Sequence, residues 1–284
     1  ITALAGKAAG VQINKNSSGI GGSAKVSLRG IRSASGDNQP LYVIDGVPML
    51  NIGTEQAYSA IGGTANAGNR DGGDGISNLN PEDVESISIL KGAPAAALYG
   101  SQAANGVILI TTKKGNTAGQ RNIYFSTGLT FDKAFSLPKM QNCYGVSDVV
   151  DSWGEKAYLP TSNELNDFFR TGLTSITSVS VNYGNEKIQT YFSYANTTGR
   201  GIVDKNQLTK HNINLRETAV MFNQRLKLDG NVNVMRQIVK NKPVSGGFYM
   251  NPLVGLYRFP RGEDLSYYKD NYEIYLSLIH ISEP

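Results

Sequence analysis

The stretch NPEDVESISILKGAPAAALYGSQAANGVILITTKKG, residues 80–115, predicts how the rest of the chain is organised. Residues 84–90 are rich in β-branched side chains and place Ile87 and Ile89 on one face, which indicates a short strand. Residues 107–112 form a continuous apolar run of the kind found in buried strands. Two strands are therefore expected within this stretch.

The residues between these strands predict one very short helix. Pro94 suits the first turn of a helix, because its missing N–H would have no partner there, and the alanines after it favour helix. Gly100 can take the left-handed conformation that commonly follows a last helical residue. A second turn of small residues at 103–106 leads into the following strand. The stretch thus predicts a compact strand–helix–strand unit.

Two shorter motifs precede it, SLRG at residues 27–30 and LYVIDGVP at residues 41–48. In the second, an apolar strand ends in a tight turn at Asp45 and Gly46, where glycine supplies a positive φ. The glycines at 19–24 match a dinucleotide-loop pattern, but the residues after them alternate as a strand, whereas a phosphate-binding loop should open a helix. We interpret them as a turn. Upstream, residues 3–9 indicate the end of a helix that leads into a strand.

After residue 121, apolar and polar residues alternate with a period of two. Ile123, Phe125 and Phe131 lie on one face, and Tyr124 and Ser126 lie on the other, as in a barrel strand with an apolar outside and a polar inside. The same pattern recurs at residues 174–183, 188–198, 208–219 and 226–239. It predicts roughly five strands, each about as long as a tilted strand that crosses a bilayer.

The composition narrows the class of protein. Charged residues make up 18% of the 284 positions, and no apolar run is long enough to cross a bilayer as a helix. A transmembrane β-barrel remains compatible, because its lipid-facing and lumen-facing residues alternate. Lys113 and Lys114 indicate a solvated strand end rather than a nucleic-acid patch. Cys143 is the only cysteine, which excludes an internal disulfide and a cysteine zinc site, and we expect it to pack as a small hydrophobe.

The three motifs, in this order, resemble the plug domain of SusC/RagA-type TonB-dependent outer-membrane transporters. ALYG at residues 97–100 followed by ANGVILITTK at residues 104–113 makes the resemblance specific, and it continues through residues 208–257. It implies an α+β plug domain, a small mixed sheet with short helices, followed by antiparallel transmembrane β-barrel strands. Plugged barrels of this kind have about 22 strands, so roughly five would make an incomplete barrel.

The resemblance sets the expected domain limits. Residues 1–118 would be an N-terminally truncated plug domain, and residues 119–277 would be the first strands and loops of the barrel. No signal peptide is visible, so we expect the true N-terminus to be missing. Residues 278–284 depart from the family pattern, and we expect them to be a non-native tail.

The resemblance also implies a function and partners. It implies TonB-dependent, energy-coupled import of a large nutrient, an oligosaccharide or oligopeptide, across the outer membrane of a Gram-negative bacterium, with the plug gating the lumen. The implied partners are a SusD-like surface lipoprotein, TonB acting through the missing N-terminal segment, and outer-membrane lipid, with no nucleic acid. A receptor for an iron chelate or cobalamin with the same fold is an alternative. A soluble α/β domain with a β-rich appendage, including an enzyme, is another.

Candidate ligand-binding residues lie in two places. The loop at residues 51–75 is long for a compact domain, which is typical of functional loops. Its Asn69, Asp71 and Asp74 could contact the cargo or offer oxygens to calcium, although the spacing fits no EF-hand, and an ordinary hydrated loop is the alternative. Tyr249 could stack on a sugar face, but tyrosine is equally the girdle residue of a barrel.

No catalytic constellation is found in the sequence. His211 is expected to be a rim residue rather than a general base. Glu82 and Asp83 follow a proline ahead of a strand, which predicts a solvated turn, and a glycosidase would need carboxyls that face each other across a cleft. Metalloprotease, nucleophile-elbow and Walker motifs are absent. We therefore expect neither an enzyme nor a cofactor or metal site.

Overall fold

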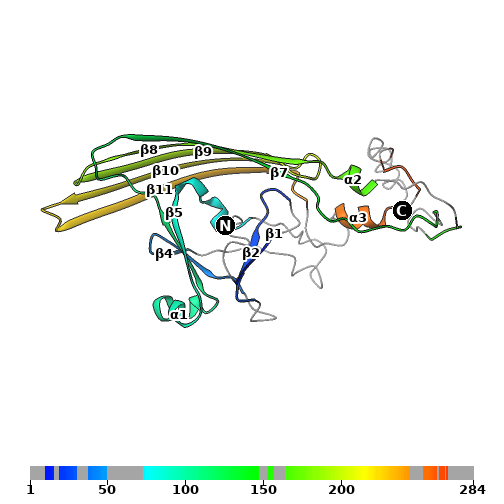
Figure 1. Cartoon of the computed structure of the whole chain (residues 1–284), viewed down its shortest axis with the longest axis horizontal. Coiled ribbons are helices and arrows are strands. Elements are labelled where there is room, and N and C mark those ends of the chain that lie inside the picture. The colour runs from blue at the N-terminus through cyan, green and yellow to red at the C-terminus, as the bar shows by residue number, and fades with distance from the viewer. Residues whose placement is uncertain are drawn as a thin grey trace, which may run out of the picture.

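The computed structural model describes residues 10–15, 19–30, 38–49, 73–146, 153–156, 164–243, 252–260, 262–265 and 267. The expected helix at residues 3–9, the candidates Asn69, Asp71 and Tyr249, and the tail at residues 278–284 lie outside these residues. The described strands form two sheets and a two-stranded ribbon (Figure 1). The plug elements lie on one side of the larger sheet.

The smaller sheet, which we call the plug sheet, has four strands in the order β4-β3-β6-β5. Its strands are β3 (Leu41–Ile44), β4 (Val47–Met49), β5 (Val84–Leu90) and β6 (Val107–Thr112). β3 and β6 are parallel, and the other pairs are antiparallel. The apolar runs of β3 and β6 fill the core, where Tyr42, Val107 and Ile108 are fully buried. The predicted strands at 84–90 and 107–112 are therefore confirmed.

Short helices connect these strands. The predicted helix is α1 (Ala93–Tyr99), and it ends at Gly100, which has the expected positive φ, 70°, although its ψ of −155° is not that of the left-handed helical conformation. The 3-10 helix η5 (Gly100–Ala103) follows it. Two further 3-10 helices, η3 (Gly75–Asn78) and η4 (Pro81–Asp83), precede β5.

A ribbon of β1 (Val11–Lys15) and β2 (Ala24–Leu28) packs beside the plug sheet. Val26 and Leu28 join Ile108 and Ile110 of β6 in one hydrophobic cluster. The glycine pattern at residues 19–24 forms a turn with positive φ at Gly19 and Gly21 and leads directly into β2. The expected turn is confirmed, because β2 begins where a phosphate-binding loop would need a helix.

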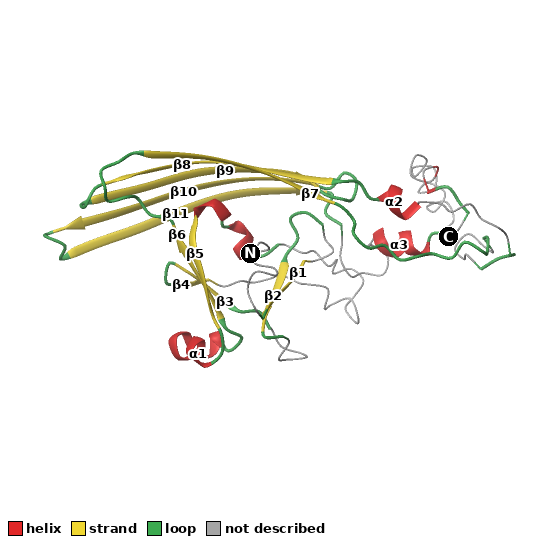
Figure 2. Cartoon of the chain, in the orientation of Figure 1, coloured by secondary structure: helices red, strands yellow, loops and turns green. Residues whose placement is uncertain are grey.

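The larger sheet, which we call the barrel sheet, has five antiparallel strands in the order β11-β10-β9-β8-β7 (Figure 2). They are β7 (Asn122–Asp132), β8 (Gly172–Gly184), β9 (Ile188–Arg200), β10 (Gln207–Met221) and β11 (Leu226–Lys240). The sheet is open, with β7 and β11 at its edges. Short turns at residues 185–187 and 222–225 lie at one end, and the long connection at residues 133–171, with α2 (Glu164–Phe168), lies at the other. α3 (Pro252–Arg258) follows β11.

The two faces of the barrel sheet differ in polarity as predicted. On β7, Ile123, Phe125 and Leu129 point away from the plug and are 72%, 71% and 63% exposed. On β10, the residues that face the plug are polar and buried, including Asn212 and Asn214. Within the described residues, no helix is long and apolar enough to cross a membrane.

Two expectations for single residues are wrong. Cys143 is exposed rather than packed as a hydrophobe, and its backbone N–H donates to the side chain of Gln141. Asp83 is fully buried rather than solvated, whereas its neighbour Glu82 is exposed. The predicted turn before β5 is present, but the carboxylate of Asp83 in this turn points into the molecule.

Candidate functional site

The candidate site is the interface between the plug and the inner face of the barrel sheet, and β10 supplies most of it. Side chains alternate across a strand, so every second residue of β10 faces the plug. Four of these residues are polar and nearly fully buried: Asn212, Asn214, Arg216 and Thr218, at 2%, 1%, 4% and 1% exposure. Buried polar groups of this kind usually have hydrogen-bond partners. Asn212, Asn214 and Arg216 each donate to the plug. The buried Oγ1 of Thr218 and Oδ1 of Asn214 have no hydrogen-bond partner among the described residues.

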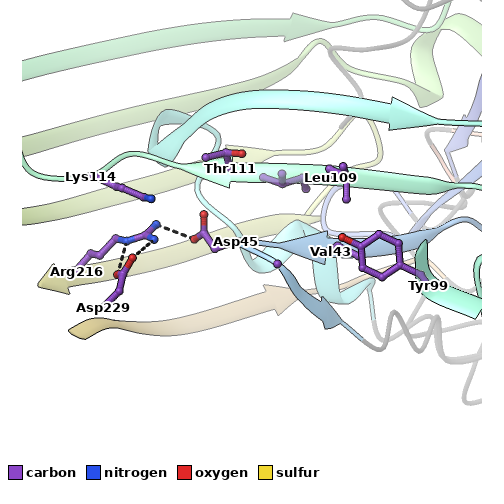
Figure 3. A pocket seen from close by; sticks show the side chains of 10 residues that line it. Val43, Asp45, Tyr99, Leu109, Thr111, Lys114, Arg216 and Asp229 are labelled. Atoms are coloured by element: carbon purple, nitrogen blue, oxygen red, sulfur yellow. Dashed lines mark hydrogen bonds and ion pairs between the residues drawn. The ribbon is translucent and has the colours of Figure 1, made fainter. Parts of the chain in front are cut away.

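Arg216 is the centre of the first cluster (Figure 3). Its guanidinium binds Asp229 of β11 through two bonds, Nε to Oδ1 at 3.0 Å and Nη2 to Oδ2 at 2.8 Å. Its Nη1 donates to Oδ2 of Asp45 at 2.8 Å and to Oγ1 of Thr112 at 2.6 Å. Paired, charge-assisted bonds of this geometry are the strong class of hydrogen bond. One arginine therefore joins two barrel strands to two plug strands.

The plug positions Asp45 for this contact. Asp45 and Gly46 form the turn between β3 and β4 with φ of 49° and 86°, so the turn places the carboxylate at the end of β3. Its Oδ1 accepts the backbone N–H of Thr112 at 2.9 Å, and its Oδ2 accepts the Thr112 hydroxyl at 2.6 Å. Because β3 and β6 are parallel neighbours, the ends of both strands meet at Arg216.

A pocket of about 340 Å³ adjoins this cluster. Figure 3 shows Lys114, Arg216 and Asp229 toward one end of the pocket and Val43 and Tyr99 toward the other. The pocket thus contains a charged end and an apolar end, at the place where the plug sheet meets β10 and β11.

The second cluster surrounds the buried carboxylate of Asp83, the last residue of η4. Tyr191 of β9 donates its hydroxyl to Oδ1 at 3.0 Å, and Asn80 donates its side-chain amide to the same oxygen at 3.2 Å. Asn214 of β10 donates to Oδ2 at 3.4 Å. None of the ion pairs among the described residues involves Asp83, so neutral donors hold this buried charge. Two of the three donors belong to the barrel sheet.

Other inner-face side chains bind the main chain of the plug. Lys210 donates to the carbonyl of Ser77 at 2.7 Å, and Asn212 donates to the carbonyl of Asn78 at 2.5 Å. In the same way, Asn206 accepts the N–H of Ile20 at 3.1 Å, and Lys242 donates to the carbonyl of Gly21 at 3.2 Å. The barrel sheet therefore holds the plug in part through main-chain groups that any sequence would present.

The segment between the plug sheet and the barrel sheet, residues 113–121, contacts β8 and β9 next to the turn that joins them. Asn182 of β8 accepts the N–H of Asn116 at 2.6 Å and donates to the carbonyl of Lys114 at 3.2 Å. A Cβ on Gly115 would meet the backbone of Gln189 and Thr190, so only glycine fits at this crossing. The chain enters the barrel sheet through a close backbone contact.

Of the predicted ligand residues, the structure describes only Asp74. Its carboxylate accepts the N–H of Ser77 at 3.0 Å as the N-cap of η3, and the N–H of Ala24 at 2.9 Å. Asp74 thus fixes the end of the long loop to the ribbon. No group of three His, Cys, Asp or Glu side chains in the described part of the chain is placed to hold a metal ion.

The predicted site residues do not include Arg216, Asp45, Tyr191 or Asp83. One pattern could have indicated the first, because residues 210, 212, 214, 216 and 218 place polar side chains at every second position of a membrane strand. His211 lies on the other face, where the hydroxyl of Tyr194 is 2.9 Å from its Nδ1. His211 is near the beginning of β10, as expected.

Comparison with known proteins assigns this architecture to a family. The family described as TonB-dependent Receptor Plug Domain matches residues 1–107. The TonB-dependent receptor SusC of Bacteroides thetaiotaomicron is 33% identical over 243 residues, which are 82% of this chain and 22% of SusC. The chain belongs to the SusC/RagA-type TonB-dependent receptors. Such receptors are outer-membrane proteins of Gram-negative bacteria, and the family consists of transporters and receptors rather than enzymes.

Solved structures share the fold of the receptor. The RagAB peptide importer in its closed-closed state superposes with a TM-score of 0.67 at 21% identity, over 93% of this chain and 32% of that chain. A ferric enterobactin receptor from Pseudomonas aeruginosa superposes with a TM-score of 0.52 at 16% identity, over 89% of this chain and 32% of that chain. The receptor chain spans 22% of the length of SusC. The matched plug region ends at the first residue of β6.

Proposed function

We propose that the receptor imports a large nutrient, an oligosaccharide or oligopeptide, across the outer membrane, and that its plug gates the barrel lumen. The observation that carries this proposal is the interface on β9 and β10, where polar side chains of the barrel sheet hydrogen bond to the plug. Exchange of such hydrogen bonds for bonds to water has a small net cost for each bond. A plug attached in this way can be pulled from the barrel sheet and can return to it.

The kind of cargo is inferred from the relatives. The likeness to SusC extends over 82% of the chain and so includes the barrel strands, and the RagAB neighbour is a peptide importer. From the likeness to the same relatives we propose a SusD-like surface lipoprotein as partner and TonB as the source of force on the plug. We also propose the limits 1–118 for the plug and 119–277 for the barrel region, and Asn69, Asp71, Asp74 and Tyr249 as cargo contacts.

Fastening the plug to the barrel sheet tests the gating role. In the full-length receptor with Cys143→Ser, Asn78→Cys and Asn212→Cys place one thiol on each side of the interface, at residues joined by a 2.5 Å bond from the Asn212 side chain to the Asn78 carbonyl. We expect oxidation, or a short bifunctional thiol reagent, to abolish uptake of labelled oligosaccharides and oligopeptides in cells, and a reductant to restore it after oxidation. Each single-cysteine variant is the control. Full uptake through the cross-linked receptor would refute gating by the plug.

An iron-chelate receptor is the second candidate. The ferrienterobactin receptor of Escherichia coli is 34% identical over 116 residues, which are 40% of this chain and 14% of that receptor. The same cells can be supplied with ferric chelates in place of glycans and peptides. Uptake of the chelate alone would favour this candidate, and uptake of glycan or peptide alone would exclude it.

A further inference from the structure

The outer face of the barrel sheet contains a pocket of about 330 Å³ that the import function does not use. Side chains of Ser175, Thr198, Arg200, Gln207 and Thr209 line it, and Leu173 forms one side. These residues alternate with inner-face positions. Gly199, between two of them, faces the plug, because a Cβ there would meet the side chain of Ile20. The pocket therefore opens away from the lumen.

The pocket lies toward the outer surface of the membrane. In barrels of the outer membrane the short turns are periplasmic and the long connections are extracellular. The pocket occupies the ends of β8, β9 and β10 that are remote from the short turns at residues 185–187 and 222–225. Its lining residues are at the extracellular ends of these strands.

Its depth corresponds to the headgroup layer. The outer face is apolar below the pocket, where Ile213, Leu215 and Val234 are 44%, 45% and 58% exposed. Thr209 is four residues from Ile213, which is about 13 Å along a strand and about 9 Å in height at a tilt of about 45°. His211 lies between the two regions and stacks at 6.2 Å on Tyr194, which pairs with Ile213. Tyrosine is enriched at the membrane–water interface.

The lining chemistry suits an anionic amphiphile. Arg200 is exposed, and it makes none of the ion pairs found among the described residues. No carboxylate lines the pocket, and three hydroxyl groups and one amide accompany the guanidinium. Leu173 pairs with Phe131 of β7, which is 69% exposed, so an apolar surface lies beside the pocket on β7 and β8. A free anion would make no favourable contact with this apolar side.

We propose that this pocket binds the headgroup of an outer-leaflet lipid that carries phosphate and hydroxyl groups. Arg200 would bind the phosphate, because the guanidinium matches phosphate geometry and basic pockets at membrane surfaces bind anionic headgroups. Ser175, Thr198 and Thr209 offer hydrogen bonds to hydroxyl groups, and an acyl chain would lie along Leu173 and Phe131. The proposal rests on the outer-membrane placement proposed above.

The test measures lipid retained by the full-length receptor. The receptor is extracted in mild detergent, exchanged into nanodiscs of phosphatidylcholine with a few per cent of bisphosphorylated lipid A, repurified, and analysed by native mass spectrometry. Two variants alter the pocket, Arg200→Gln and the pocket-filling Ser175→Leu. Arg225→Gln, at an exposed arginine in the β10–β11 turn at the opposite end, is the matched control.

We expect at least fivefold less retained lipid A in both pocket variants and no change in the control. Dephosphorylated lipid A should bind the original receptor as weakly as bisphosphorylated lipid A binds Arg200→Gln. Equal retention by all proteins would overturn the proposal, and so would equal competition by soluble glucose 1-phosphate, which would indicate a free-anion site. If the receptor left the membrane without detergent, the outer-membrane placement itself would fail, which is a different result.

Discussion

Arg216 illustrates how single residues hold the two parts of the receptor together. Its side chain is 5% exposed, and its carboxylate partners Asp45 and Asp229 are 17% and 30% exposed. Taking such groups out of water is costly, and the ion pairs repay that cost only when the geometry is good and the remaining donors are used. The bonds to Asp45, Thr112 and Asp229 meet at this one guanidinium, so its removal takes away the cation that both carboxylates bind.

We expect Arg216→Met to loosen the plug. Removing one partner of a buried ion pair costs about 3–5 kcal/mol, because a charge is left unpaired. The urea concentration at which trypsin begins to cleave the plug in the detergent-solubilised receptor should fall. Arg225→Met, at an exposed arginine in the β10–β11 turn, should leave that concentration unchanged. An unchanged concentration for Arg216→Met would show that the cluster does not hold the plug.

The hydroxyl of Tyr191 is expected to matter in a similar way. Tyr191→Phe removes one of three donors to the buried carboxylate of Asp83, and an unsatisfied buried polar group costs about 1–3 kcal/mol. The same protease assay should show an earlier release of the plug. Tyr183→Phe is the matched control, because Tyr183 is 38% exposed and its ring can still contact Arg121. Equal behaviour of the two variants would contradict the role of Asp83.

The residue-level site was only partly predictable from sequence. Asp83 follows a proline and an exposed glutamate, so nothing near it distinguishes a buried carboxylate from a solvated one. Its barrel partner Asn214 is 131 residues away. Asp45 was correctly placed in a turn, but its partner Arg216 is 171 residues away. Such long-range pairs depend on tertiary packing, which local sequence patterns do not specify.

At the scale of elements, alternation predicted the barrel strands well. The strands expected at residues 188–198 and 226–239 are confirmed as β9 and β11, with ends displaced by no more than two residues. The reason is physical, because a strand between lipid and lumen must alternate along its length. The ends of strands are predicted less precisely by this alternation, because rim positions tolerate both polar and apolar side chains.

This alternation predicts opposite effects for adjacent residues of β11. Val234 is 58% exposed on the outer face, and Asn233 lies beside it on the inner face. We expect Val234→Arg to lower folding stability in lipid vesicles by about 2–4 kcal/mol, as for arginine near a bilayer midplane. Asn233→Arg should have a much smaller effect. Equal losses would mean that the two faces of β11 are assigned wrongly.

The link between plug and barrel gives a further prediction. A Cβ on Gly115 would lie 2.6 Å from the backbone carbonyl carbon of Gln189, whereas a Cβ on Gly128 would meet nothing within 4 Å. We expect Gly115→Val to lower the yield of folded receptor severalfold and Gly128→Val to have little effect. The yield is measured as the heat-modifiable fraction on a gel. Normal yield from Gly115→Val would show that the close crossing is dispensable.

At the scale of the whole molecule, the open barrel sheet is the dominant feature. β7 and β11 each have one neighbour, so both edges present unpaired backbone groups. Such groups have no partner in lipid and promote pairing between chains in water. The resemblance predicted this incomplete barrel, because the plug motifs are followed by far fewer alternating strands than closure needs.

We therefore expect residues 1–284, expressed alone, to aggregate or to associate through these edges. Size-exclusion chromatography with light scattering in detergent should show large, polydisperse species. A monodisperse monomer that unfolds cooperatively would contradict this expectation and would show that the plug suffices to shield the edges.

Lys210 and Asn212 reach the carbonyl groups of Ser77 and Asn78, and every amino acid offers the same carbonyl. Mutations at these two plug positions can therefore accumulate over generations without disturbing the fit. The plug and the barrel could then change in sequence partly independently of each other. A plug grafted from a divergent homologue should seat in this barrel, provided that the graft keeps the carboxylates that face the barrel sheet.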